Sequence, residues 1–353
     1  MKIEHSILKK LTIVIFSYNR HKYLKQTIKY WLDYNINLVV LDGSDERLND
    51  PCLDMKNIKY VHNPKGLYER LLSSIDYIDT EYMILACDDE FYLPSTLSSC
   101  IEFLINNPSF SSCGGRALGF GHDGKNYFGF DPYPKLKNLC LDSNNNINRL
   151  IKHFSTYVPA HVYSVMNANK WKKICTHTFK KKYDFYAAFE TQVEFLSIVS
   201  GKSKIIPQLL WIRNREVAPI ATKYPNLDPT LNIKNWWHDQ KYLSEKKDFL
   251  KTMKNACDEI STDQNSKLSE NEIAILIELY ISRPVFKKNP LKRIVNFFQI
   301  RKKMLTKFIL GRDQIRFNSI IDKAKALESQ GVLVNYEELN KIISIIQNSK
   351  NQG

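Results

Sequence analysis

Compact apolar runs alternate with amphipathic segments over the first 120 residues of the chain. Runs rich in branched and aromatic side chains predict strands at residues 11–17, 38–41, 58–61 and 82–86. Apolar residues at three- and four-residue spacing predict helices at residues 21–34 and 66–78, and a further helix begins at Pro94. Strands this apolar need cover on both faces, so the alternation predicts a mostly parallel α/β sheet with helices on both sides.

The pattern becomes less regular in the middle of the chain. Six glycines between residues 114 and 129 suggest turns and close approach of the backbone. A helix is predicted at residues 184–200 and a strand at 205–212. From Trp236 the composition shifts to helices and lysines. We expect an α/β domain at residues 1–232, with halves at about 10–120 and 121–215, and a basic α-helical region at 233–353.

Charge and cysteine usage narrow the classes of protein that fit. Lys plus Arg number 51 and Asp plus Glu 37, a formal net charge of +14, which favours an anionic partner such as nucleic acid, a membrane surface or a phosphorylated substrate. Seven scattered cysteines without a CxxC pair argue against a disulfide framework and a zinc site. No run reaches the roughly 18 apolar residues of a membrane span. We expect a cytoplasmic protein, with peripheral attachment to the inner face of the membrane as an option.

Three consecutive acids, Asp88, Asp89 and Glu90, follow the predicted strand at 82–86. Ligands of open α/β sheets bind beyond the carboxyl ends of the strands. Adjacent carboxylates repel one another, and a hard cation such as Mg²⁺ or Mn²⁺ would relieve that repulsion while bridging to substrate phosphates. An isolated acidic triplet is more often a solvated loop. The other strand ends therefore decide whether this is a metal–diphosphate site.

Three strand ends together resemble the GT-A glycosyltransferases of the family 2 type. The segment 12–20 is similar to the family's opening strand with its Tyr-Asn-Arg loop, and 39–45 is similar to a second strand that ends in Asp-Gly-Ser. The acids before Pro94 resemble its DxD element, in a bacterial subgroup with Cys-Asp-Asp-Asp/Glu-Phe. The resemblance covers residues 10–215. It implies a Rossmann-like GT-A fold and transfer of a sugar from a nucleoside-diphosphate sugar to a hydroxyl of a glycan or lipid-linked acceptor, in surface polysaccharide biosynthesis.

The resemblance also implies roles for individual acids. Counting back from Pro94 places Asp89 at the main ligand position for Mg²⁺ or Mn²⁺ and Glu90 beside it. Cys87 occupies a position where the family has an aspartate, and a thiol is a poor ligand for these ions. Asp88 is then the candidate to contact the donor in its place.

Further donor-binding positions come from the neighbouring loops. Asp42 matches a position near the nucleotide base, although an Asp-Gly-Ser turn on its own is common. Tyr18 and Arg20 match positions that flank the nucleotide, and Arg20 is suited to a phosphate. Arg213, just after the strand at 205–212, is a further candidate for the diphosphate.

An inverting transfer requires a carboxylate that removes the proton of the acceptor hydroxyl. In the family this acid often opens a helix about eleven residues before a glycine, and Glu190 stands at that spacing before Gly201. Glu190 is the candidate base and Glu194, one turn later, is the reserve. A solvated helix carboxylate is the competing interpretation, and a retaining enzyme would not need this base.

The segment 283–316 holds 11 Lys or Arg against one acid, with apolar residues at helical spacing. This pattern is typical of helices that bind anionic membrane surfaces, and a helix packed through its apolar face fits it equally. Charge alone would also allow a nucleic-acid-binding protein. The sequence contains no nucleic-acid-binding motif, so we expect no nucleic acid to bind. A nucleotidyl or phosphoryl transferase using the same metal site is the third alternative, without a P-loop.

Overall fold

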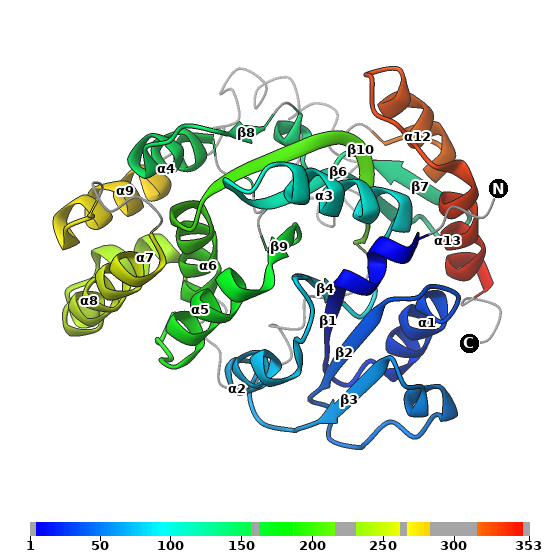
Figure 1. Cartoon of the computed structure of the whole chain (residues 1–353), viewed down its shortest axis with the longest axis horizontal. Coiled ribbons are helices and arrows are strands. Elements are labelled where there is room, and N and C mark those ends of the chain that lie inside the picture. The colour runs from blue at the N-terminus through cyan, green and yellow to red at the C-terminus, as the bar shows by residue number, and fades with distance from the viewer. Residues whose placement is uncertain are drawn as a thin grey trace, which may run out of the picture.

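The computed structural model describes residues 5–137, 139–156, 158, 162–185, 187–215, 231–261, 267–282 and 316–348. Ten strands form one sheet within these residues (Figure 1). The strands are β1 (Leu11–Ser17), β2 (Asn37–Asp42), β3 (Ile58–His62), β4 (Tyr82–Cys87), β5 (Phe91–Tyr92), β6 (Phe110–His122), β7 (Tyr127–Phe130), β8 (Cys140–Leu141), β9 (Val165–Asn167) and β10 (Lys202–Asn214). The predicted strands at 11–17, 38–41, 58–61, 82–86 and 205–212 are therefore confirmed.

The sheet is mostly parallel, with its main strands in the order β3-β2-β1-β4-β9-β6-β10-β5. Strands β3, β2, β1 and β4 run parallel to one another, and β6 runs parallel to β10. The short strand β9 lies antiparallel between β4 and β6 and joins the two parallel halves. Its three residues carried no sequence signal that separated them from a loop.

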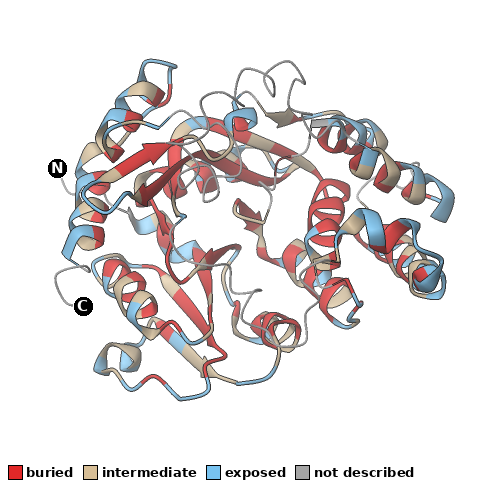
Figure 2. Ribbon diagram, turned by 180° about the vertical axis from the view of Figure 1, so that it is seen from behind, coloured by how far each residue is buried: buried red, intermediate tan, exposed pale blue. Residues whose placement is uncertain are grey.

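Helices cover both faces of the sheet, as predicted. They are α1 (His21–Trp31), α2 (Leu67–Ser73), α3 (Pro94–Asn106), α4 (Asn146–Thr156), α5 (Ala168–Phe179), α6 (Ala188–Val199), α7 (Ile233–His238), α8 (Leu243–Ile260), α9 (Glu270–Ser282), α12 (Ile320–Glu328) and α13 (Tyr336–Asn348). Within β1, Ile13 and Ile15 join the core beneath α1, α3, α12 and α13, whereas Val14 joins the core beneath α2, α4, α5, α6, α8 and α9. Figure 2 shows the resulting buried centre of the sheet.

The glycine-rich segment is a strand, so the prediction of turns there was wrong for most of its length. β6 contains four of the six glycines, and a Cβ on Gly119 or Gly121 would lie 2.4 or 2.6 Å from the ring of Phe130 or Phe128 on β7. These glycines make room for aromatic rings across the pair of strands. Only Gly124, with φ 99°, sits in the expected turn between β6 and β7.

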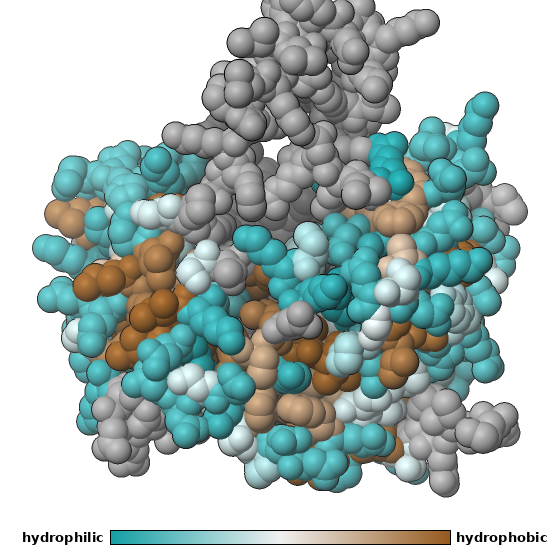
Figure 3. Space-filling model, turned by 90° about the horizontal axis from the view of Figure 1, so that it is seen from above, coloured by the Kyte–Doolittle hydropathy of each residue, from teal (hydrophilic) through white to brown (hydrophobic). Residues whose placement is uncertain are grey.

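The described part of 233–348 is helical and packs on both faces of the sheet. Trp236 and Trp237 of α7 pack against Phe249 of α8 in one core, whereas α12 and α13 complete the other. No described helix is long and apolar enough to cross a membrane. Polar side chains cover much of the described surface on the face in Figure 3, with apolar side chains gathered in patches between them.

Candidate active site

The carboxyl ends of β1, β2 and β4 meet at one edge of the sheet. Ser17 pairs with Asp42 in the strand register, and Phe16 pairs with Cys87. The loops that leave these strands therefore start side by side, as the sequence predicts. Tyr18 lies half-buried in the first of them.

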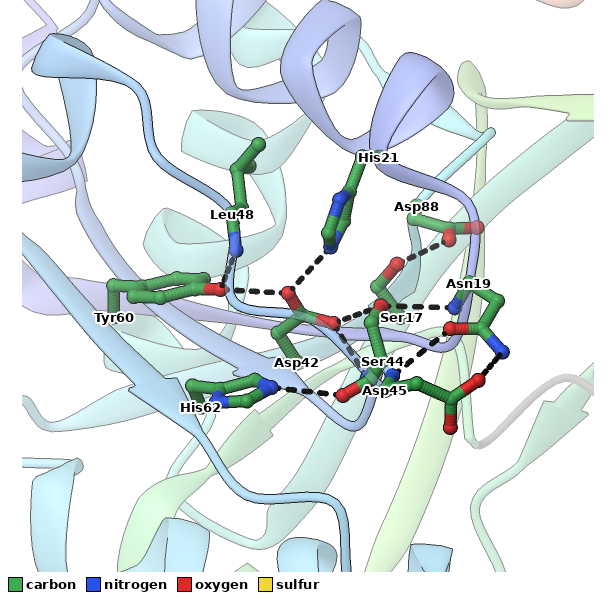
Figure 4. A network of polar contacts seen from close by, with 10 residues as sticks. All are labelled: Ser17, Asn19, His21, Asp42, Ser44, Asp45, Leu48, Tyr60, His62 and Asp88. Atoms are coloured by element: carbon green, nitrogen blue, oxygen red, sulfur yellow. Dashed lines mark hydrogen bonds and ion pairs between the residues drawn. The ribbon is translucent and has the colours of Figure 1, made fainter.

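Asp42 is a fully buried carboxylate that organises the second loop (Figure 4). Ser44 donates from its backbone N at 2.9 Å and its Oγ at 2.5 Å, the Tyr60 hydroxyl donates at 2.6 Å, and His21 Nε2 lies 2.9 Å away. Burial alone would raise the pKa of Asp42, but the hydrogen bonds from Ser44 and Tyr60 outweigh it and hold that pKa below its usual value. Asp42 is thus an ionised anchor.

The first two loops are locked to each other by Asn19. Its backbone adopts the left-handed conformation, φ 52°, which asparagine tolerates, and its N donates to Ser44 Oγ at 2.9 Å. Its side chain exchanges hydrogen bonds of 2.8 and 3.0 Å with Asp45 (Figure 4). A pocket of about 350 Å³, lined by Asn19, His21, Asp45 and Glu46, opens beside this network. A ligand in it would meet these side chains, of which His21 contacts Asp42.

Arg20 lies between the first two acids of the acidic run. Its Nη2 is 3.2 Å from Asp88 Oδ1 and 2.5 Å from Asp89 Oδ2, and the guanidinium is almost fully buried. Asp88 also accepts a hydrogen bond of 2.7 Å from Ser17 Oγ, and its backbone oxygen accepts one of 2.7 Å from Thr27. Asp88 is therefore held inside the protein, which makes it a support for Arg20 and leaves Asp89 closer to the surface.

Burial makes ionisation of the acids at this strand end unfavourable. Burial raises the pKa of Asp88, which the charge of Asp89 raises further, and burial also raises the pKa of Asp89; Arg20 opposes both effects. Burial likewise raises the pKa of the Cys87 thiol well above its usual value, so Cys87 is a neutral neighbour. An additional cation would lower the energy of the ionised acids.

Glu90 points to β10 instead of to Arg20. Its Oε2 accepts a hydrogen bond of 3.0 Å from Trp211 Nε1, and its Oε1 lies 3.5 Å from Arg213 Nε. Burial raises the pKa of Glu90 and the positive charge of Arg213 opposes that rise. Arg213, predicted to bind the diphosphate, is thereby brought to the same edge of the sheet as Arg20 and the acids.

The three acids do not form a ready-made metal cage. No group of three or more His, Cys, Asp or Glu side chains that could hold a metal ion occurs in the part of the chain that the structure describes. Mg²⁺ commonly uses only one or two protein carboxylates together with substrate phosphates. Of the three acids, Asp89 is tied neither to Ser17 nor to Trp211, and its partner is Arg20.

Glu190 and Glu194 lie in different environments on α6. The surface of the Glu190 side chain is exposed to solvent. Protein atoms nevertheless surround its carboxyl group densely enough to raise its pKa to about 7, and the charge of Glu194 makes a smaller contribution. Such a carboxylate can be reached by a substrate and still take up a proton near neutral pH. Glu194 is fully buried, 3.0 Å from His153 Nε2, and accepts a hydrogen bond from Val162 N. That placement favours a structural role for Glu194.

Sequence reasoning did not single out several side chains of this region, among them His21 and Tyr60 beside Asp42 and also Arg70 and Trp211. Arg70 of α2 is buried against the Asp-Gly-Ser turn and donates a hydrogen bond of 2.5 Å to the Lys65 carbonyl oxygen. Trp211 of β10 holds Glu90 and stacks between Tyr133 and Tyr163. Neither residue follows a predicted strand end, and only the strand pairing and the helix packing bring them to this edge of the sheet.

Comparisons with known proteins bear on the fold that carries this site. Residues 12–169, which contain the three strand ends, match the family described as glycosyl transferase family 2. Among solved structures, the chain is similar to S. aureus TarS 1-349 in complex with UDP-GlcNAc, with a TM-score of 0.50 and 14% identity over 84% of this chain and 77% of that one. A structure of TarS 1-349 alone gives a TM-score of 0.44 and 13% identity over 77% and 89%. No curated protein matches significantly. The predicted GT-A type fold is confirmed.

Proposed function

We propose that the protein moves a sugar from a nucleoside-diphosphate donor to a hydroxyl group of an acceptor. The observation that carries the proposal is the convergence of Arg20 and Arg213 on the acids that end β4. These acids and Arg20 lie within residues 12–169, which match glycosyl transferase family 2. Two guanidinium groups at one strand end suit a diphosphate, which accepts paired hydrogen bonds. The UDP-GlcNAc bound to TarS makes a UDP-sugar the first donor to test.

A divalent cation, Mg²⁺ or Mn²⁺, would be held by Asp89 and by the donor phosphates. When bound, such an ion neutralises charge that builds up on the leaving diphosphate. Arg20 already neutralises Asp89 in the free protein, and Arg213 would contact the diphosphate beside it. We propose an inverting reaction in which Glu190 takes the proton of the acceptor hydroxyl.

The acceptor is proposed as a chemical class, together with the place in the cell where the enzyme meets it. We propose a glycan or lipid-linked acceptor of a surface polysaccharide, used by a cytoplasmic enzyme that contacts the anionic inner face of the membrane through residues 283–316. All of that segment except Arg316 lies outside the described residues. Retention of the protein on liposomes that contain anionic lipid, and its release by salt, would support this contact; equal recovery with neutral liposomes would contradict it.

Thermal unfolding with candidate donors tests the donor class. UDP-GlcNAc at 100 times its dissociation constant should add about 2.7 kcal/mol of stability. Mn²⁺ should strengthen binding in the unaltered protein, but not in Asp89→Asn. Asp79→Asn, at an exposed aspartate, is the matched control and should behave like the unaltered protein. No stabilisation by any nucleoside-diphosphate sugar would overturn the proposed function. In an assay of the reaction products, release of pyrophosphate instead of UDP would favour a nucleotidyl transferase.

A further inference from the structure

The register of two antiparallel strands places Glu90 opposite Arg213. Phe91 of β5 pairs with Ile212 of β10, so the next pair outward joins Glu90 to Arg213. Both oxygens of the buried Glu90 carboxylate face β10, one at Trp211 Nε1 and one at Arg213 Nε. Asp88 and Asp89 face Arg20 on β1's side of the site instead. Consecutive acids in the sequence thus serve two different arginines.

Arg213 is held on more than one side and remains open at its end. Its guanidinium carbon lies 5.2 Å from the ring centre of Tyr133 and 5.4 Å from that of Trp211. Tyr163 stacks on Trp211 at 4.3 Å, which fixes the indole in turn. The Arg213 side chain is nonetheless 36% exposed. Nε is the nitrogen that lies nearest Glu90, and the two outer nitrogens carry four further N–H donors that suit an anion.

We propose that Glu90 is a positioning residue: together with Trp211 it fixes Arg213 for the donor diphosphate, and it is not a ligand of the metal ion. The inference rests on the proposed function and reassigns one of the two acids that the sequence motif marks for the metal. An arginine whose rotamer is fixed before binding loses less conformational freedom when the diphosphate arrives. The acidic run then divides its work, with Asp89 for the cation and Glu90 for Arg213.

The test is a double-mutant cycle on UDP affinity, measured by calorimetry with and without Mn²⁺. Arg213→Gln should weaken UDP binding about five- to tenfold because it removes the N–H donors that contact the diphosphate, and Glu90→Gln should weaken it by a similar factor because Arg213 is no longer fixed. The double variant should bind as weakly as Arg213→Gln alone, because Glu90 acts through Arg213. The gain in UDP affinity from Mn²⁺ should be unchanged in Glu90→Gln and lost in Asp89→Asn.

Trp211→Phe provides a second route if Glu90→Gln fails to fold. It keeps the ring between Tyr133 and Tyr163 but removes the N–H that holds Glu90, so UDP binding should weaken about two- to threefold with no change in the Mn²⁺ effect. Loss of the Mn²⁺ effect in Glu90→Gln, independent effects of Glu90→Gln and Arg213→Gln, or unchanged UDP affinity in Trp211→Phe would each overturn the inference. Failure of the unaltered protein to bind UDP would instead remove the proposed function itself.

Discussion

At the scale of single residues, Gly43 shows how tightly the donor edge is packed. A Cβ at this position would lie 1.7 Å from Arg70 Nη1 and 2.1 Å from Arg70 Cζ. The Arg70 side chain is 1% exposed and cannot move into solvent without leaving its hydrogen bond to Lys65. Glycine is therefore required in the Asp-Gly-Ser turn for the space that it leaves to Arg70.

Gly43→Ala should lower the free energy of unfolding by about 1–3 kcal/mol, the usual range for overpacking a filled site. Urea unfolding measures the change. The same substitution in an Arg70→Ala background should cost clearly less, because the clashing group is gone. Equal costs in both backgrounds would mean that Arg70 is not what excludes the side chain.

Glu190 gives a prediction of pH dependence. Its pKa is raised to about 7, mainly by burial, so a Glu190 base is increasingly protonated below pH 7. We expect kcat to fall about tenfold for each pH unit below 7, and Glu190→Gln to remove both most of the turnover and this dependence. The measurement is a pH–rate profile at saturating donor. A profile that is flat between pH 5.5 and 8 would exclude Glu190 as the base.

The ionisation of Glu190 should also make the stability of the fold depend on pH. Turnover should rise with pH, whereas the contribution of Glu190 to the free energy of unfolding should fall. A carboxyl group whose folded pKa lies above the unfolded value binds more protons when folded. Its contribution is therefore complete below pH 4.5 and is lost as the pH rises to 7. Above pH 7, Glu190→Gln should be at least as stable as the unaltered protein in thermal unfolding; a clear loss of stability there would contradict the assigned shift.

At the scale of elements, local pattern predicted those strands and helices whose own sequence decides their form. β1, β2 and β4 are apolar runs with no competing signal, and their parallel pairing follows from the alternation with helices. β6 was missed because its glycines, which on their own indicate turns, make room for the aromatic rings of β7, the next strand along the chain. β10 contains Pro207 at an irregularity of its pairing with β6, where a strand tolerates proline.

The contact between α13 and α3 carries a prediction for this scale. Ser95 donates from N at 2.9 Å and from Oγ at 2.7 Å to the Glu338 carboxylate, which thereby satisfies the first turn of α3. Glu338→Ala should cost about 1–2 kcal/mol in urea unfolding. Glu337→Ala, at the exposed neighbouring position, should change stability by less than about 0.5 kcal/mol. Similar effects of the two variants would refute the capping role.

At the scale of the whole molecule, the C-terminal helices belong to the core that supports the site. Ile320 and Leu327 of α12 and Leu339 and Ile342 of α13 are at most 3% exposed. Phe317 pairs with Gly129, and Leu333 exchanges hydrogen bonds with Pro207 and Leu209 of β10. Helices at 233–353 were predicted, but their amphipathic pattern could not indicate which surface they cover.

A chain ending at residue 315 should therefore not fold stably. Each large apolar side chain that loses its burial costs about 1.5–3 kcal/mol, and four such losses approach the whole stability of a typical domain. Near-ultraviolet circular dichroism and size-exclusion chromatography would show loss of fixed tertiary structure or aggregation. A chain ending at Asn348 is the control. A monomeric, cooperatively unfolding product from the shorter chain would show that α12 and α13 are accessory.

The active-site candidates illustrate the same limit over longer distances. The sequence indicated the strand-end residues Asp42 and Asp89 because each follows its own strand. It could not show that Trp211 holds Glu90 across 121 residues, or that Arg20 neutralises two acids at the end of another strand. Such pairs arise from sheet topology, which periodicity does not encode.

The hydrogen bonds between Ser95 and Glu338 also limit when the start of α3 can be completed during translation. The two residues are 243 positions apart, and a ribosome adds about 5–20 residues per second. The helix that follows the acidic run therefore waits roughly 12–50 seconds for its cap during synthesis. Until Glu338 has been added to the chain, Ser95 lacks the carboxylate that caps it in the folded protein, so this end of α3 is completed only at the close of synthesis.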